Sequence, residues 1–242
     1  MRFPVVHQAL LALVLVGCAI APPAPPAAKA VALPPAVTLN RLHGNPGETM
    51  EFLITLRGIT VGRVQTAVGQ PGLISGRQAI IVKSQAIGEG VIAIATDYRG
   101  ELTTTLDLER GAPMSMRKEE WMVVLGKPDH NEHSQSWGIT NDRHEAHSAA
   151  GLLRGWISRP GDRATFRLWF GGGTEVTVVN SGRVLFPVGN RPAIRYDGTV
   201  GTEHPFTVWI SDDTARVPLR MRAPTPLGVA EAELVHYDAP RD

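Results

Sequence analysis

The chain has 242 residues, and its 24 lysine and arginine residues nearly balance 23 aspartate and glutamate residues. Without a basic excess there is little positive charge to neutralise phosphates, which argues against a nucleic-acid partner. The single cysteine excludes an intrachain disulfide and a zinc site built from several cysteines, and the sequence predicts no cofactor.

The first residues have the features of an export signal. Arg2 provides a positive charge, and residues 5–16 are almost wholly apolar. That stretch is shorter than the ~20 residues of a membrane-spanning helix and fits the ~7–15 residues of a signal-peptide core. The run Leu15-Val16-Gly17-Cys18 resembles the bacterial lipobox, which implies cleavage after Gly17 and a lipid-modified Cys18 as the first mature residue.

A stretch rich in proline and alanine follows Cys18 and extends to about residue 37. Because proline lacks a backbone donor, this stretch is expected to form an extended spacer. The predicted organisation is a signal peptide at 1–17, a lipidated linker at 18–46 and a single β-rich domain at 47–242. The lipid anchor makes the membrane a predicted partner in the bacterial cell envelope. Ala19, in place of an aspartate, predicts the outer membrane, with the domain facing the periplasm.

Short runs of alternating apolar and polar residues dominate the remaining chain, and the run at 50–56 is the clearest. This alternation predicts strands with one buried face. The expected strands cover 50–56, 59–68, 77–85, 100–108, 114–125, 165–170, 174–180, 191–198, 206–211, 217–222 and 227–237. Their spacing and the turn residues between them predict a mainly β fold, a barrel or a sandwich of antiparallel strands.

One helix is expected, at residues 148–158. Ser148 is its candidate N-cap, and an apolar stripe follows at helical spacing. Gly151 and Gly155 oppose helix formation by about 1 kcal/mol each. The predicted fold therefore contains one or two short helices beside its strands.

A polar insert at 127–147 holds four candidate metal ligands: His130, His133, His144 and His147. Each pair is separated by two residues, a spacing at which imidazoles converge on a metal ion if the segment is helical. This pattern allows a metal-dependent or acid/base hydrolase. The simpler interpretation is a solvated polar hairpin without a metal.

Several segments carry a family resemblance: VWISDD at 208–213, RVPLR at 216–220, Gly228 with AEL at 232–234, and LRGITVG at 56–62. They are similar to segments of the DUF3108 family, exported bacterial proteins of unassigned function. The resemblance covers about 48–237. It implies an antiparallel sheet curled into an incomplete β-barrel, like that of the LolA and LolB lipoprotein carriers. It brings no catalytic residues, and the insert at 127–147 has no counterpart in it.

Three tryptophans and one leucine are candidate ligand-lining residues. Leu53, Trp169 and Trp209 alternate out of phase with the apolar residues beside them, so they lie on the second face of their strands. A sheet with one solvated face has few large apolar residues on that face. We therefore expect an apolar groove there, roofed by the helix that carries Trp156. An ordinary two-sided core is the alternative.

The leading hypothesis is a non-enzymatic, membrane-anchored protein that binds an apolar, lipid-like ligand or another envelope component. The first alternative is the hydrolase described above. The second is a structural envelope-assembly factor that binds no ligand. Convergence of the four histidines would favour the hydrolase, whereas an enclosed apolar cavity would favour the binding protein.

Overall fold

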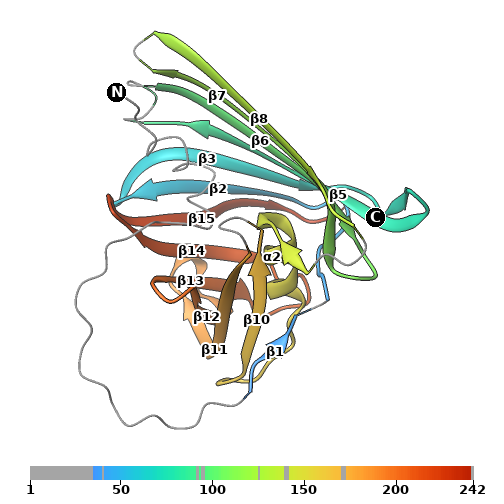
Figure 1. Cartoon of the computed structure of the whole chain (residues 1–242). Coiled ribbons are helices and arrows are strands. Elements are labelled where there is room, and N and C mark those ends of the chain that lie inside the picture. Colours follow the sequence, from blue (N-terminus) through green and yellow to red (C-terminus); the bar gives the residue numbers. More distant parts are fainter. Residues whose placement is uncertain are drawn as a thin grey trace.

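The computed structural model describes residues 35–39, 41–90, 93, 96–124, 126–138, 142–169 and 173–240, and Figure 1 shows how its elements are arranged. Cys18 and the whole predicted signal peptide lie outside the described residues. The strands are β1 (Val37–Thr38), β2 (Thr49–Leu56), β3 (Ile59–Val68), β4 (Gly72–Ile74), β5 (Arg77–Gly88), β6 (Thr96–Asp107), β7 (Ala112–Val124), β8 (Lys127–Ser136), β9 (Arg143–His144), β10 (Arg163–Leu168), β11 (Thr174–Phe186), β12 (Arg191–Val200), β13 (His204–Ser211), β14 (Pro218–Thr225) and β15 (Gly228–Asp238). The helices are α2 (Ala146–Gly155) and the short 3-10 helix η3 (Val188–Asn190).

All the described strands belong to one sheet. Its order is β1-β10-β11-β12-β13-β14-β15-β2-β3-β5-β6-β7-β8, with β4 beside β5 and β9 beside β10. Neighbours pair antiparallel except where β1 and β9 run parallel to β10. The sheet curls until its two ends meet. This closure is seen where His133 of β8 packs on Trp169, which directly follows β10. The predicted mainly β, antiparallel and curled sheet is thus confirmed.

The two faces of this sheet differ in polarity. On β2, Ile54 is buried on the concave face, whereas Glu51 points to the convex face and forms an ion pair with Arg63 of β3. A second cross-strand pair joins Lys83 of β5 to Glu101 of β6 on the same convex side, at 2.7 Å. On β2, β3, β5 and β6, alternation therefore places apolar side chains inside the curl and solvated charges outside it.

Helix α2 lies within the curl, as Figure 1 shows. Leu152 and Leu153 are buried there in one cluster with Phe166 of β10 and Val176 of β11. The helix was expected at 148–158 with Ser148 as N-cap, but it begins two residues earlier and is capped by Glu145. The Glu145 carboxylate accepts from the backbone N–H groups of residues 147 and 148, and the Ser148 hydroxyl accepts from the backbone N–H of Glu145. Such a capping box satisfies the free amide groups of the first turn.

The segment just before β2 crosses α2 at close range, and it corrects one predicted boundary. The linker was expected to extend to residue 46, yet β1 pairs with β10 and Leu39 is buried in the core that surrounds α2. The backbone of His43 donates to the carbonyl of Gly151 at 2.9 Å. Packed chain therefore begins before residue 47, because these residues cover one side of the helix.

Of the two helix glycines, Gly155 is the one that this crossing requires. A Cβ at Gly155 would overlap the backbone carbonyl of Arg41, whereas a Cβ at Gly151 would meet only the end of the Leu42 side chain, at 2.8 Å. A side-chain end can rotate away but a backbone carbonyl cannot. Glycine thus permits a backbone approach that outweighs its poor helix propensity.

Replacing Gly155 with alanine is expected to lower the free energy of unfolding by about 1–3 kcal/mol, because the new methyl group overpacks against fixed backbone. The Gly151→Ala variant is the matched control, and its change should stay within about 1 kcal/mol. Urea-induced unfolding followed by tryptophan fluorescence measures both. Equal effects of the two substitutions would contradict the close crossing at Gly155.

The polar insert at 127–147 forms β8, β9 and the first residues of α2. β8 pairs with β7 along its whole length in antiparallel register, and nearly all of its residues are exposed. In Figure 1 this hairpin forms an arm that extends beyond the rest of the sheet. None of the helices in the described part of the chain combines the length and hydropathy needed to cross a bilayer.

Candidate functional site

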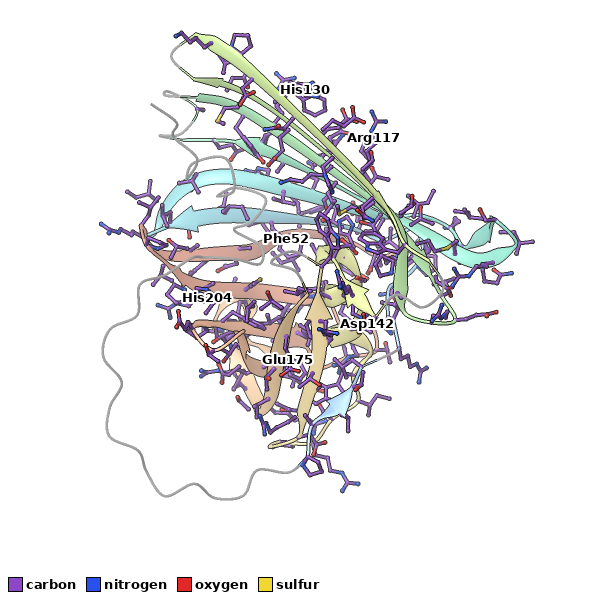
Figure 2. The ribbon with its side chains drawn as sticks, in the orientation of Figure 1. Phe52, Arg117, His130, Asp142, Glu175 and His204 are labelled. Carbon is purple, nitrogen blue, oxygen red and sulfur yellow. The ribbon has the colours of Figure 1, made fainter. Side chains whose placement is uncertain are left out.

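A cavity of about 170 Å³ lies between α2 and the concave face of the sheet. Its walls come from both halves of the curl, with β2, β3, β5 and β6 on one side and β10 to β15 on the other. The apolar side chains that line it are Met50, Phe52, Ile54, Val64, Ala86, Leu102, Ala146, Ala149, Ala150, Leu153, Phe166, Leu168, Val176, Val200, Phe206, Val208, Ile210, Pro218, Met221 and Ala232. Figure 2 labels Phe52 on β2, one of these residues. A concave apolar hollow with few polar groups is typical of a ligand site.

Four described residues with polar side chains also line the cavity: Thr66, Ser84, His147 and Arg220. The guanidinium of Arg220 donates to Glu233 at 2.9 Å and also lies over the Phe186 ring. These contacts already neutralise the charge of Arg220. Thr66, Ser84 and His147 therefore supply the polar groups that remain available inside the hollow.

These three residues belong to one hydrogen-bonded chain that ties α2 to the sheet. The hydroxyls of Thr66 and Ser84 lie 2.7 Å apart, and the Ser84 hydroxyl lies 2.7 Å from Nε2 of His147. On the other side of the ring, Nδ1 lies 3.0 Å from the hydroxyl of Thr104. The chain thus links β3, β5, α2 and β6 across the wall of the cavity.

The His147 ring in this chain is neutral at pH 7. Its side chain is only 8 % exposed, and burial lowers the pKa of the imidazole below its ordinary value of 6.5. The Glu145 carboxylate acts in the opposite direction but does not outweigh burial. A neutral ring donates from one nitrogen and accepts at the other, which matches a hydroxyl on each side.

A second hollow of about 180 Å³ adjoins the first, and Thr66 and His147 of this hydrogen-bonded chain line both. It shares Met50, Thr66, His147, Ala150 and Pro218 with the first. Leu42 and Arg154 are among its other lining residues. Helix α2 therefore borders two adjoining spaces inside the curl, and its position determines the size of both.

A buried ion pair holds α2 in this position. Arg154, in the last turn of the helix, is 3 % exposed, and Glu48, just before β2, is fully buried. The guanidinium donates to both carboxylate oxygens and to the carbonyls of Ala215 and Arg216, each at 2.9 Å. Burial alone would raise the pKa of Glu48, but the bonds and charge of Arg154, aided by Asn45, hold it below the usual range.

The four predicted lining residues do not line this cavity. Leu53 pairs with Arg63 and Glu233 on the convex face, and Trp209 packs there on Phe186. Trp156 is buried against Tyr196, with ring centres 5.4 Å apart, and Trp169 packs on His133 and Trp137. The alternation correctly placed these residues and their apolar neighbours on opposite faces of the strands. The face that lines the hollow, however, is the one that carries the neighbours, such as Phe52 and Phe166.

The four histidines occupy separate environments. His130 stacks on Trp121 of β7, whereas His133 meets Trp169, because residues three apart on a strand point to opposite faces. His144 lies edge-on to Phe166, and His147 belongs to the hydroxyl chain. In Figure 2, His130 lies on the β7–β8 arm, apart from Asp142, which directly precedes β9. Among the described residues, no three histidine, cysteine or acidic side chains are grouped to hold a metal.

The sequence analysis missed Thr66 and Ser84. Both occupy the inward phase of their strands, in rows whose other members include Val64 and Val68 on β3 and Val82 on β5. The sequence signal that could have identified each residue was a hydroxyl within a row of apolar side chains. This signal could not show that the two hydroxyls and His147 meet, because the pairing of β3 with β5 and the docking of α2 bring these groups together.

Comparisons with known proteins support the fold. No protein-family model and no curated protein matches the chain, so the DUF3108 resemblance stays a prediction. Among solved structures, the chain is similar to a β-barrel-like protein of the DUF1849 domain of unknown function from Brucella abortus. The TM-score is 0.51 with 10 % identity, over 84 % of this chain and 100 % of that one.

Two further structures match less well. One is a candidate exported protein with a YmcC-like fold from Bacteroides fragilis, with a TM-score of 0.35 and 12 % identity, over 83 % of this chain and 99 % of that one. The other is a candidate lipoprotein from Parabacteroides distasonis, with a TM-score of 0.33 and 7 % identity, over 83 % and 99 %. The match to the Brucella protein therefore identifies the fold of this chain as β-barrel-like.

Proposed function

We propose that this chain is a non-enzymatic, lipid-anchored protein of the bacterial envelope that binds an apolar, lipid-like ligand inside its curled sheet. The observation that carries the proposal is the cavity of about 170 Å³ between α2 and the concave face, whose lining is almost wholly apolar. An apolar cavity of roughly 150 Å³ in another protein stays dry and takes up benzene, so a hollow of this size accommodates one hydrocarbon group. The adjoining hollow of about 180 Å³ provides space for the rest of a larger ligand.

The sequence supplies the envelope part of the proposal. The lipobox ending at Cys18 and the proline-rich spacer behind it fit a protein tethered to a membrane, with the folded part held away from it. Ala19 favours the outer membrane and a periplasmic location. Density-gradient fractionation of the native cells tests this location, and recovery in inner-membrane fractions would contradict it.

Filling the cavity should weaken ligand binding. Ala150 on α2 is exposed yet lines both hollows, so it borders open space inside the curl. A phenyl group introduced by Ala150→Phe occupies this space and should weaken binding of an apolar dye, N-phenyl-1-naphthylamine, by at least about tenfold. Tenfold corresponds to about 1.4 kcal/mol, within the range expected for losing apolar contacts. The mature chain from residue 18, with Cys18→Ala to remove the lipid, is titrated by dye fluorescence.

Ala67→Phe is the matched control, because Ala67 is exposed on β3 at the position that follows Thr66 and points to the convex face. It should leave dye binding unchanged. Unfolding in urea checks that both variants remain folded. Dye binding that is absent from the parent chain, or equal in the two variants, would refute the proposed ligand site.

A further inference from the structure

We propose that the chain formed by Thr66, Ser84 and His147 is a polar subsite that binds one uncharged hydroxyl or carbonyl group of the apolar ligand. The inference rests on the proposed function and narrows the ligand to a neutral amphiphile, such as a long-chain alcohol or an acyl ester. It concerns the one place in the described cavity wall where polar side-chain groups are both present and not occupied by an ion pair.

The hydrogen-bonding capacity of this chain exceeds what its members use on one another. The Ser84 hydroxyl contacts Thr66 and His147, whereas a hydroxyl offers one donor and two acceptor positions. Thr66 is the terminal member of the chain, with Ser84 as its partner, and it lines both hollows. A ligand atom beside Thr66 would extend the chain by one bond.

Either direction of the bonds is available to the ligand. If His147 Nε2 carries the proton, it donates to Ser84, Ser84 donates to Thr66, and Thr66 donates to a ligand carbonyl. If Nδ1 carries the proton, it donates to Thr104, and each hydroxyl turns around, so that Thr66 accepts from a ligand hydroxyl. The distances of 2.7, 2.7 and 3.0 Å fit both patterns.

The surroundings favour an uncharged group. Burial lowers the pKa of His147 and keeps its ring neutral at pH 7. The nearby Glu145 carboxylate is occupied by the first backbone amides of α2, and Arg220 pairs with Glu233. A charged ligand group would enter an apolar space without a counter-ion, which is unfavourable. A neutral hydroxyl or carbonyl needs one hydrogen bond, which this chain provides.

The test compares 1-octanol with 1-chlorooctane as competitors of N-phenyl-1-naphthylamine on the mature chain carrying Cys18→Ala. The two molecules share an eight-carbon chain, but only the alcohol has a hydroxyl group. After correction for their partition between water and hydrocarbon, the parent chain should bind the alcohol about tenfold more tightly. Thr66→Val, which keeps the shape of the side chain, should remove this preference and leave chlorooctane binding unchanged.

Thr104→Val is the matched control. It makes the same change at the other end of the same hydrogen-bonded chain, where Thr104 is fully buried and does not line the cavity. It should keep the preference for the alcohol. A chain that serves only to attach α2 to the sheet would give two variants with altered stability and unaltered preference, which would overturn the inference.

The remaining outcomes separate the two proposals. If both competitors displace the dye equally from the parent chain, the polar subsite is wrong while the apolar site stands. If the dye itself does not bind to the parent chain, the proposed function fails and the subsite fails with it. If the dye binds but the alcohol does not displace it, the subsite is wrong. Loss of the preference in both valine variants would also count against Thr66 as the contact.

Discussion

Replacing Arg154 with methionine is expected to lower the free energy of unfolding by about 3–5 kcal/mol, because it leaves the fully buried Glu48 carboxylate without its counter-ion. The substitution also removes the donors to the carbonyls of Ala215 and Arg216. Methionine retains an unbranched apolar side chain, so lost packing contributes little. Urea-induced unfolding of the mature chain at pH 7, followed by tryptophan fluorescence, measures the change.

Two further variants isolate the buried charge as the cause. Arg167→Met breaks an exposed ion pair with Asp142 and should cost less than about 1 kcal/mol. Adding Glu48→Gln to Arg154→Met should recover part of the loss, because the stranded group is then uncharged. Similar losses for Arg154→Met and Arg167→Met would show that the buried pair does not hold α2.

The same pair predicts a dependence on pH. Arg154 holds the pKa of the folded Glu48 carboxyl below its ordinary value of 4.5, which the unfolded chain retains. The stabilisation is therefore fully present above about pH 4.5 and is lost as pH falls through the lowered folded value. The difference in stability between the parent chain and Arg154→Met should shrink over that range. A difference that stays constant as the pH falls below 4.5 would contradict this account.

Replacing Cys18 with alanine is expected to release the protein from the membrane almost completely. The substitution removes the thiol that would carry the acyl chains, and each buried CH₂ of such a chain contributes about 0.8 kcal/mol to membrane attachment. Two or more acyl chains hold a protein stably in the membrane. Partition of cell extracts between detergent and aqueous phases measures the effect.

The neighbouring substitution Ala19→Ser is the control for export, because it changes a small residue beside Cys18 but keeps the thiol. It should remain in the detergent phase. Metabolic labelling with a radioactive fatty acid should mark this variant and leave Cys18→Ala unlabelled. A Cys18→Ala chain that still partitions with detergent would show that attachment depends on another part of the protein.

The strands were the most predictable part of the molecule, because their signal is local. The alternation at 59–68 corresponds residue for residue to β3, and that at 191–198 lies within β12. The strand β8 lacked this signal, since both of its faces are exposed and polar. Pairing with β7 makes it a strand, and such pairing is not visible in the composition of β8 alone.

The helix shows how local rules compete. Ser148 and Glu145 are both acceptable at a helix start, and the reciprocal bonds between them identify Glu145 as the cap. The glycines of α2 weaken a purely local prediction. Glycine is needed in this helix because the backbone of residues 41–43, more than 100 positions away in the sequence, crosses it at close range.

The sequence predicted an apolar ligand site covered by a helix, but it did not predict which residues line that site. Two-faced strands indicated an apolar space covered by a helix, and the cavity and α2 are present. The choice of face was wrong at Trp209, which packs outside on Phe186 with arginine side chains over its ring. Alternation says that two residues lie on opposite faces of a strand, but the direction in which a sheet curls depends on all of its strands together.

By itself, the sequence determined features that depend on neighbouring residues: the strand periods, a helix near 148–158 and the mainly β class. The resemblance to a lipobox at Cys18 is likewise a local pattern. The tertiary structure decided the features that depend on distant segments. It selected the concave face, joined Glu48 to Arg154 and assembled Thr66, Ser84 and His147 from two strands and α2. Local propensity acts over a few bonds, whereas burial and charge pairing act between any segments that the folded backbone brings within a few ångströms.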